Sequence, residues 1–153
     1  MSSENSNSNQ QDQLITLGWR EWISLPELGI TKIKTKVDTG ARTSALHAFF
    51  VEPYKEQGAQ HVRFGIHPIQ GDSETSIICT APVMDKREVT DSGGHKETRY
   101  IIEATAEIGT TKRKIEMSLT NRDTMKFRML LGRTALAGEF KVDPELSYCC
   151  GTL

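Results

Sequence analysis

The chain has 153 residues and a net charge of −1, with 19 basic against 20 acidic side chains. This length predicts one globular domain, and the near neutrality excludes an overall field that would attract nucleic acid or an anionic membrane. Three cysteines, two of them adjacent, are typical of a reducing compartment rather than of a disulfide framework. No apolar run reaches the ~20 residues of a membrane span, so we expect a cytoplasmic protein.

The first 13 residues contain no apolar side chain after the start Met. Such a segment cannot bury enough surface to offset the entropy that is lost on ordering. We therefore predict a disordered tail over residues 1–13. No internal repeat or linker interrupts the rest, and we predict a single domain over residues 14–153.

Apolar and polar residues alternate along several short segments, which is the pattern of half-buried strands. In residues 32–37, Ile33, Thr35 and Val37 face one side and three lysines face the other, which we interpret as a solvated sheet face. Similar alternation occurs at Val62, Phe64 and Ile66, at residues 100–108 and, after a turn around residues 109–111, at Ile115, Met117 and Leu119.

The run TSIICTAPVMDKREVT (75–90), followed by DSGGHKETRYIIEA (91–104), predicts two long strands joined in a hairpin. Its tip contains Gly93 and Gly94. One short helix is predicted over residues 133–139. Seven or so short strands with one short helix are typical of an all-β barrel or sandwich.

The tripeptide Asp38-Thr39-Gly40 follows the first of these strands and has two interpretations. Asp and Gly are ordinary turn formers after a strand, so the tripeptide alone favours a turn. Much later in the chain, the apolar segment 129–131 ends in Gly132-Arg133, directly before the predicted helix. Together the two segments favour an acid at Asp38.

These segments, VDTGA (37–41) and MLLGRTAL (129–136), resemble the retropepsin-like aspartic proteases. That family places its catalytic acid in an Asp-Thr/Ser-Gly-Ala loop and later has an apolar strand that ends in Gly-Arg before a short helix. The longer run KVDTGARTSALHA (36–48) is similar to a bacterial and archaeal subgroup labelled ATP-dependent zinc proteases, often encoded beside ATP-grasp glutamate ligases. The resemblance extends over about residues 17–146.

The resemblance implies a closed all-β barrel with a glycine-tipped flap hairpin and one short C-terminal helix. It implies a homodimer, because each chain supplies one Asp38 and the two carboxylates share a proton. Thr39 is expected to bond across the two-fold axis, and Gly40 to let a substrate strand approach. The residues expected to bind substrate are Ala41, Arg42, Gly93, Gly94 and Arg133.

Arg42 departs from the family, which usually has an acidic residue here, paired with the arginine of the Gly-Arg motif. Because Arg42 and Arg133 are both cationic, that ion pair is excluded. The two arginines suit an acidic peptide such as a glutamate-rich tail, or else each pairs with another carboxylate of the fold. Both interpretations stay open.

No metal or cofactor is predicted from the sequence. There is no His-Glu-x-x-His, the four histidines include no i, i+4 pair, and no Gly-rich phosphate loop is present. His47, inside the longer motif, is interpreted as a structural histidine. Three functions stay open: a homodimeric aspartic endopeptidase, a non-catalytic module acting with an ATP-grasp glutamate ligase, and a zinc-dependent peptidase.

Overall fold

The computed structural model describes residues 13–69, 71–72, 74–90, 93–121 and 126–151. The predicted tail therefore lies outside the described residues except for Gln13. Within the described ranges, the helical elements are a 3-10 turn η1 (Pro26–Leu28) and one short helix α2 (Arg133–Leu136), and neither is long enough to cross a membrane. The strands are β1 (Ile15–Leu17), β2 (Arg20–Leu25), β3 (Ile30–Asp38), β4 (Ser44–His47), β5 (Phe50–Glu56), β6 (Ala59–Ile66), β7 (Ile77–Pro82), β8 (Asp85–Thr90), β9 (Lys96–Ile108), β10 (Thr111–Thr120), β11 (Met129–Gly132) and β12 (Phe140–Val142).

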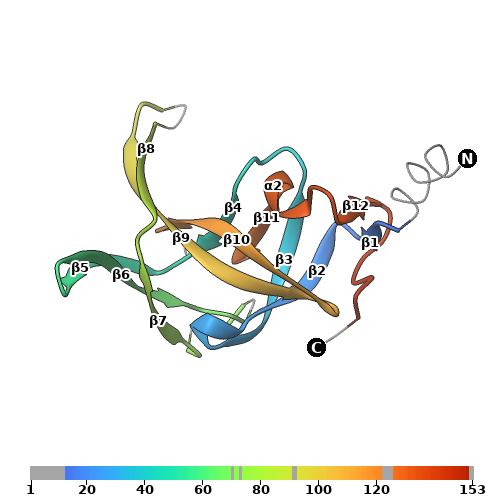
Figure 1. The fold of residues 1–153 in the computed structure, drawn as a ribbon, viewed down its shortest axis with the longest axis horizontal. Coiled ribbons are helices and arrows are strands. Elements are labelled where there is room, and N and C mark those ends of the chain that lie inside the picture. The colour runs from blue at the N-terminus through green and yellow to red at the C-terminus, as the bar shows by residue number, and fades with distance from the viewer. Residues whose placement is uncertain (1–12, 70, 73, 91–92, 122–125, 152–153) are drawn as a thin grey trace, which may run out of the picture.

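Six strands close into a barrel in the order β10-β4-β11-β3-β2-β9, because β10 pairs with β9 as well as with β4. β8 extends this sheet beyond β9 and forms the hairpin that stands away from the barrel at the upper left of Figure 1. A three-stranded sheet of β5, β6 and β7 lies on one side, and the parallel pair of β1 and β12 lies on the other. The predicted all-β class and closed barrel are confirmed.

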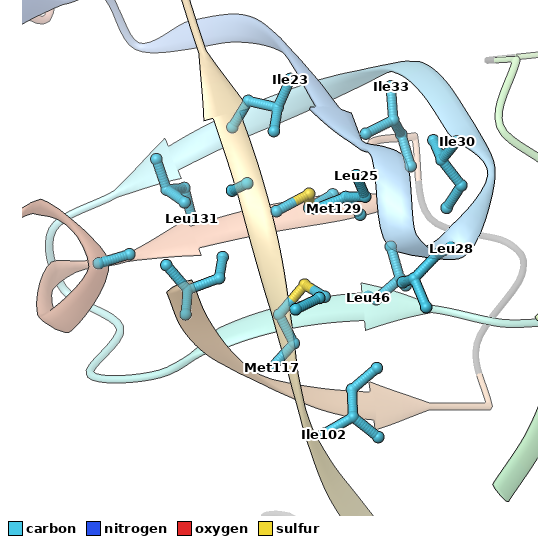
Figure 2. Close-up of a cluster of buried hydrophobic side chains, with 14 of the residues drawn as sticks. Ile23, Leu25, Leu28, Ile30, Ile33, Leu46, Ile102, Met117, Met129 and Leu131 are labelled. Atoms are coloured by element: carbon cyan, nitrogen blue, oxygen red, sulfur yellow. The ribbon is translucent and has the colours of Figure 1, made fainter. Parts of the chain in front are cut away.

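The core fills the barrel with the side chains that the alternation predicted. On β3, Ile33, Thr35 and Val37 are buried, whereas Lys32 and Lys36 are exposed. Figure 2 shows apolar side chains from β2, β3, β4, β9, β10 and β11 converging on the same interior. Each fully buried Leu or Ile side chain contributes about 1.5–3 kcal/mol of transfer free energy, so this interior holds the barrel strands in place.

The long strand predicted over residues 75–90 is wrong, because the chain forms two strands with different partners. β7 pairs with β6, and β8 pairs with β9. Between them, the Val83 amide donates to the Gln60 carbonyl oxygen at 3.0 Å, and the Met84 amide donates to that of Ile101 at 2.7 Å. The chain therefore changes sheets within two residues.

The predicted helix over residues 133–139 is also shorter in the structure. α2 ends at Leu136, because Ala137 has an extended ψ of 128°.

The segment after β12 folds back against β2 and is held there by Glu21, whose side chain is fully buried. Its carboxylate accepts hydrogen bonds from the amides of Gly18 at 2.7 Å, Cys149 at 2.8 Å and Cys150 at 3.1 Å. A buried carboxylate is tolerated when backbone donors replace its water. Glu21 thus joins the two ends of the described domain.

Candidate active site

The two sequence segments of the candidate site meet on neighbouring strands. β11 lies between β3 and β4, parallel to the first and antiparallel to the second. In this register Gly132 is the Cα partner of Asp38. Residues 39–43 connect β3 to β4 and must therefore pass around the end of β11. We call residues 38–43 the Asp38 loop.

Local hydrogen bonds fix the start of this loop. The Gly40 amide donates to Oδ1 of Asp38 at 3.0 Å, and the Ala41 amide donates to the Asp38 carbonyl oxygen at 3.2 Å. This is the Asx-turn geometry by which an aspartate turns the chain after a strand. The Asp38 side chain is half-buried, and none of the ion pairs among the described residues involves it. The turn former and the candidate acid are therefore the same residue.

The first residues of α2 bind the carbonyl groups of the Asp38 loop. The Arg133 amide donates to the Ala41 oxygen at 2.8 Å, and the Thr134 amide and hydroxyl donate to the Arg42 oxygen at 3.2 and 2.7 Å. The guanidinium of Arg133 donates from Nη1 to the Gly40 oxygen at 3.1 Å. Three successive carbonyl groups of the loop are thereby held by the Gly-Arg segment.

Gly132 makes this close contact possible. Its amide donates to the buried Ser44 hydroxyl oxygen at 3.0 Å. A Cβ at Gly132 would stand 2.7 Å from the carbonyl carbon of Thr43 and 2.9 Å from the Ser44 amide nitrogen. Ser44 and Thr134 have no predicted role in the sequence, and their positions within the runs 36–48 and 129–136 are the signal that could identify them.

The remaining predicted site residues lie at the surface. Thr39 and Arg42 are exposed, and no ion pair among the described residues involves Arg42 or Arg133. Thr39 lines a cavity of about 550 Å³, whose other walls come from α2, β12 and the link between them.

Gly93 and Gly94 are exposed at the tip of the β8–β9 hairpin, where Gly94 has a φ of +83°. The hairpin extends from the barrel, so the structure does not bring its tip into the hydrogen-bonded loop (Figure 1). Their predicted role in binding substrate stays a prediction.

Metal ligands do not gather within the described ranges, where no three His, Cys, Asp or Glu side chains lie close enough to hold an ion. His47, inside the motif, is buried and its Nδ1 hydrogen-bonds to the hydroxyl of Thr120. The cysteines are free, and burial raises the pKa of the Cys79 thiol to about 11 and that of Cys150 to about 11. Without a bound metal, these two cysteines are therefore protonated thiols at neutral pH.

Several known proteins resemble this chain over most of its length. A protein named probable alpha-L-glutamate ligase from Parasynechococcus marenigrum is 45% identical over 139 residues, which are 91% of this chain and 30% of that protein. A protein of the same name from Shewanella pealeana is 41% identical over 140 residues, 92% of this chain and 31% of its own length. The chain thus spans about three tenths of the length of these relatives.

A solved structure has the same fold. A Legionella pneumophila protein of unknown function superposes with a TM-score of 0.72 at 24% identity, over 89% of this chain and 98% of its own. The family model for the retropepsin-like aspartic endopeptidase RimB matches residues 16–151, a range that includes the Asp38 loop and the Gly-Arg segment. The chain therefore belongs to the RimB-like family of retropepsin-like aspartic endopeptidases.

Proposed function

We propose that this protein is an aspartic endopeptidase whose active site combines the Asp38 carboxylates of two chains. The observation that carries the proposal is the Asp38 loop itself. Its carbonyl groups are held by Arg133 and Thr134, while the Asp38 side chain stays half-buried and outside every ion pair of the described residues. Such a carboxylate is positioned and still accessible to a water and a peptide.

The chemistry follows from placing two such carboxylates together. Two carboxylates about 3 Å apart do not both ionise, so the pair holds one proton. The ionised Asp38 takes a proton from a water molecule, whose oxygen attacks the peptide carbonyl carbon. The protonated Asp38 donates to the carbonyl oxygen, and the resulting tetrahedral intermediate releases the amine after proton transfer to its nitrogen. The two carboxylates titrate as a unit, so the macroscopic pKa values belong to both residues.

The surface beside Thr39 supports association with a second copy. The cavity of about 550 Å³ next to Thr39 has a mainly apolar wall from Leu136, Ala137, Phe140 and Val142. β1 and β12 pair only with each other among the described strands, so each has one edge without a strand partner, and β12 also lines this wall. An apolar wall with free strand edges is suited to burial against the same surface of a second chain.

We also propose that exposed Arg42 favours acidic peptides, such as glutamate-rich segments. No carboxylate among the described residues forms an ion pair with it, and its carbonyl oxygen is fixed by Thr134. An arginine held next to the acid is suited to bind a substrate carboxylate. Arg42→Ala should reduce discrimination between acidic and neutral peptides, and unchanged discrimination would reject this role.

The central test is peptide cleavage between pH 4 and 7. Wild type, Asp38→Asn and the control Asp72→Asn, a half-buried carboxylate between β6 and β7, are incubated with a peptide mixture that includes glutamate-rich sequences. Loss of about 10²-fold or more in Asp38→Asn alone is expected for a proton-transferring residue. Cleavage that survives Asp38→Asn but stops with a chelator would instead identify the zinc-dependent peptidase.

The names of the relatives favour a second candidate function. This chain corresponds to about three tenths of proteins named probable alpha-L-glutamate ligase, so a domain of this kind is joined to a ligase in other organisms. In this second candidate function, the chain is a non-catalytic module that binds an ATP-grasp glutamate ligase. Absence of cleavage, together with a monomer that binds such a ligase with micromolar or tighter affinity, would favour this function over the peptidase.

A further inference from the structure

Two arginines face each other across the β8–β9 hairpin. Arg87 of β8 is the register partner of Arg99 of β9. Like charges directly opposite each other destabilise an antiparallel strand pair. Both side chains keep contact with solvent, with exposed fractions of 45% for Arg87 and 25% for Arg99. A bound anion would remove the repulsion between them.

Both arginines line one small cavity at the base of this hairpin. Its volume is about 150 Å³, and its other walls are Ile101 of β9, Ser118 of β10 and Thr43 of the Asp38 loop. At roughly 30 Å³ per water, it has room for roughly five waters or for one short side chain. The lining carries two positive charges and no negative one.

Each arginine has an acidic neighbour that lies outside the lining of the cavity. Nε of Arg87 lies 2.9 Å from Oδ2 of Asp85, and Nε of Arg99 lies 3.5 Å from Oε2 of Glu97. Neither carboxylate lines the cavity. A guanidinium has five N–H donors, and the buried Nε of Arg99 makes no hydrogen bond. Donors therefore remain for another carboxylate.

The cavity is connected to Asp38 through a short series of contacts. The Ser118 hydroxyl donates to the Ser44 carbonyl oxygen at 3.4 Å, and the Ser44 hydroxyl accepts from the amide of Gly132, the register partner of Asp38. Thr43, which lines the cavity, belongs to the same loop as Asp38. One wall of the cavity is therefore part of the Asp38 loop, along which a peptide substrate would lie.

We propose that Arg87 and Arg99 form a subsite for one carboxylate side chain, a glutamate or an aspartate, of the peptide substrate. This inference rests on the proposed endopeptidase function in taking the ligand to be a peptide. The subsite is separate from Arg42, because Arg42 does not line the cavity. The two features determine preference at different positions of the peptide.

The test compares peptides that carry Glu or its uncharged isostere Gln at one position at a time. kcat/KM is measured for wild type, Arg87→Gln, Arg99→Gln and Arg99→Lys. The control is Lys96→Gln, an exposed cation of the same hairpin that lies 3.6 Å from Glu88 and outside the cavity. We expect wild type to prefer Glu at one position by about tenfold or more, because charged hydrogen bonds contribute about 1.5–3 kcal/mol.

Both Arg→Gln variants should lose that preference, because their cleavage of the Glu peptide should fall much more than their cleavage of the Gln peptide. Arg99→Lys should retain part of it, and Lys96→Gln all of it. The subsite is overturned if the preference survives in both Arg→Gln variants. It is also overturned if Glu and Gln peptides lose cleavage equally, because that result indicates a structural role for the arginines.

Binding separates failure of the subsite from failure of the proposed function. Calorimetric titration of the same proteins with triglutamate and triglutamine requires no cleavage. Tighter binding of triglutamate that weakens in both Arg→Gln variants, but not in Lys96→Gln, supports the subsite even if no peptide is cleaved. Equal binding of the two peptides by wild type overturns it, whatever the cleavage assay shows.

Discussion

Gly132 lies directly opposite Asp38 in the parallel pairing of β11 with β3, and the backbone of residues 43 and 44 occupies the space that a side chain at Gly132 would need. Because Gly132 has no side chain, the Asp38 loop can lie close to β11. Two segments that are distant in sequence become one hydrogen-bonded unit through this contact.

Gly132→Ala should therefore displace the Asp38 loop. Its φ of −85° is allowed for alanine, so the cost comes from crowding against Thr43 and Ser44, about 1–3 kcal/mol for an overpacked site.

The matched control is Gly58→Ala, where φ is +81° and no atom lies within 4 Å of the added Cβ. A left-handed alanine costs about 1–2 kcal/mol. Urea unfolding should show similar losses for both variants, but only Gly132→Ala should lose cleavage, and equal cleavage in both would contradict the steric account.

Arg133 is expected to act on the loop rather than on the substrate. Because its guanidinium donates to the Gly40 oxygen, Arg133→Ala should lower kcat by about tenfold, as the loss of one such bond implies, for acidic and neutral peptides alike. As an exposed residue it should change stability by less than about 1 kcal/mol. The control Arg63→Ala removes an exposed arginine paired with Glu52. A rise in KM confined to acidic peptides would assign Arg133 to substrate binding instead.

Removal of the Glu21 carboxylate should destabilise the whole domain. Both of its oxygens accept backbone hydrogen bonds, whereas a glutamine at this position offers only one acceptor. Glu21→Gln should lower the free energy of unfolding by about 2 kcal/mol, and Glu21→Ala by more. Denaturant titration measures both, with Glu116→Gln, an exposed residue of β10, as the control. Equal midpoints for Glu21→Gln and the control would show that the three bonds contribute nothing.

The three cysteines should differ in their rates of alkylation. Cys79 and Cys150 have a pKa of about 11, mainly because burial disfavours the thiolate. Burial, and then the charge of Glu21, also raise the pKa of exposed Cys149. Since the thiolate is the reactive form, all three should react more slowly with iodoacetamide at pH 7 than free cysteine, with Cys149 first. Mass spectrometry of native and urea-unfolded protein measures the order, and rapid native labelling of Cys79 would contradict it.

The sequence predicted those parts of the fold that depend on local periodicity. Alternation identified the buried sides of β3, β6, β9 and β10, and the turn before Thr111 is present between β9 and β10. The break at Val83 and Met84 could not be read from alternation, because the residues keep a strand-like pattern while the partner strand changes. Such a change depends on tertiary contacts rather than on local propensity.

The two tryptophans show the same limit. Trp19 and Trp22 are three residues apart, so one continuous strand would place their side chains on opposite faces. The strand begins at Arg20, and both rings are half-buried outside the core. Trp19 packs edge-on against Phe127 at 5.8 Å, and Trp22 stacks on Tyr148 at 5.7 Å. These partners come from the far end of the chain, so no local pattern identifies them.

For the candidate site, the sequence predicted some of the residues that gather but not how they are held. Asp38, Gly40, Ala41 and Arg133 meet in one hydrogen-bonded unit. The opposed pair of Arg87 and Arg99 depends on the register of β8 against β9. The sequence predicts one strand over residues 75–90, and that prediction does not give the register of β8 against β9.

The position of β11 between β3 and β4 also has a consequence for the order of assembly during synthesis. Residues 129–132 leave the ribosome long after Asp38, yet their strand must be in place before the Asp38 loop acquires its hydrogen-bond partners. Contacts of such long sequence separation form late and cooperatively. A nascent chain that lacks β11 therefore cannot hold Asp38 in its final geometry, and the site is completed only together with the barrel.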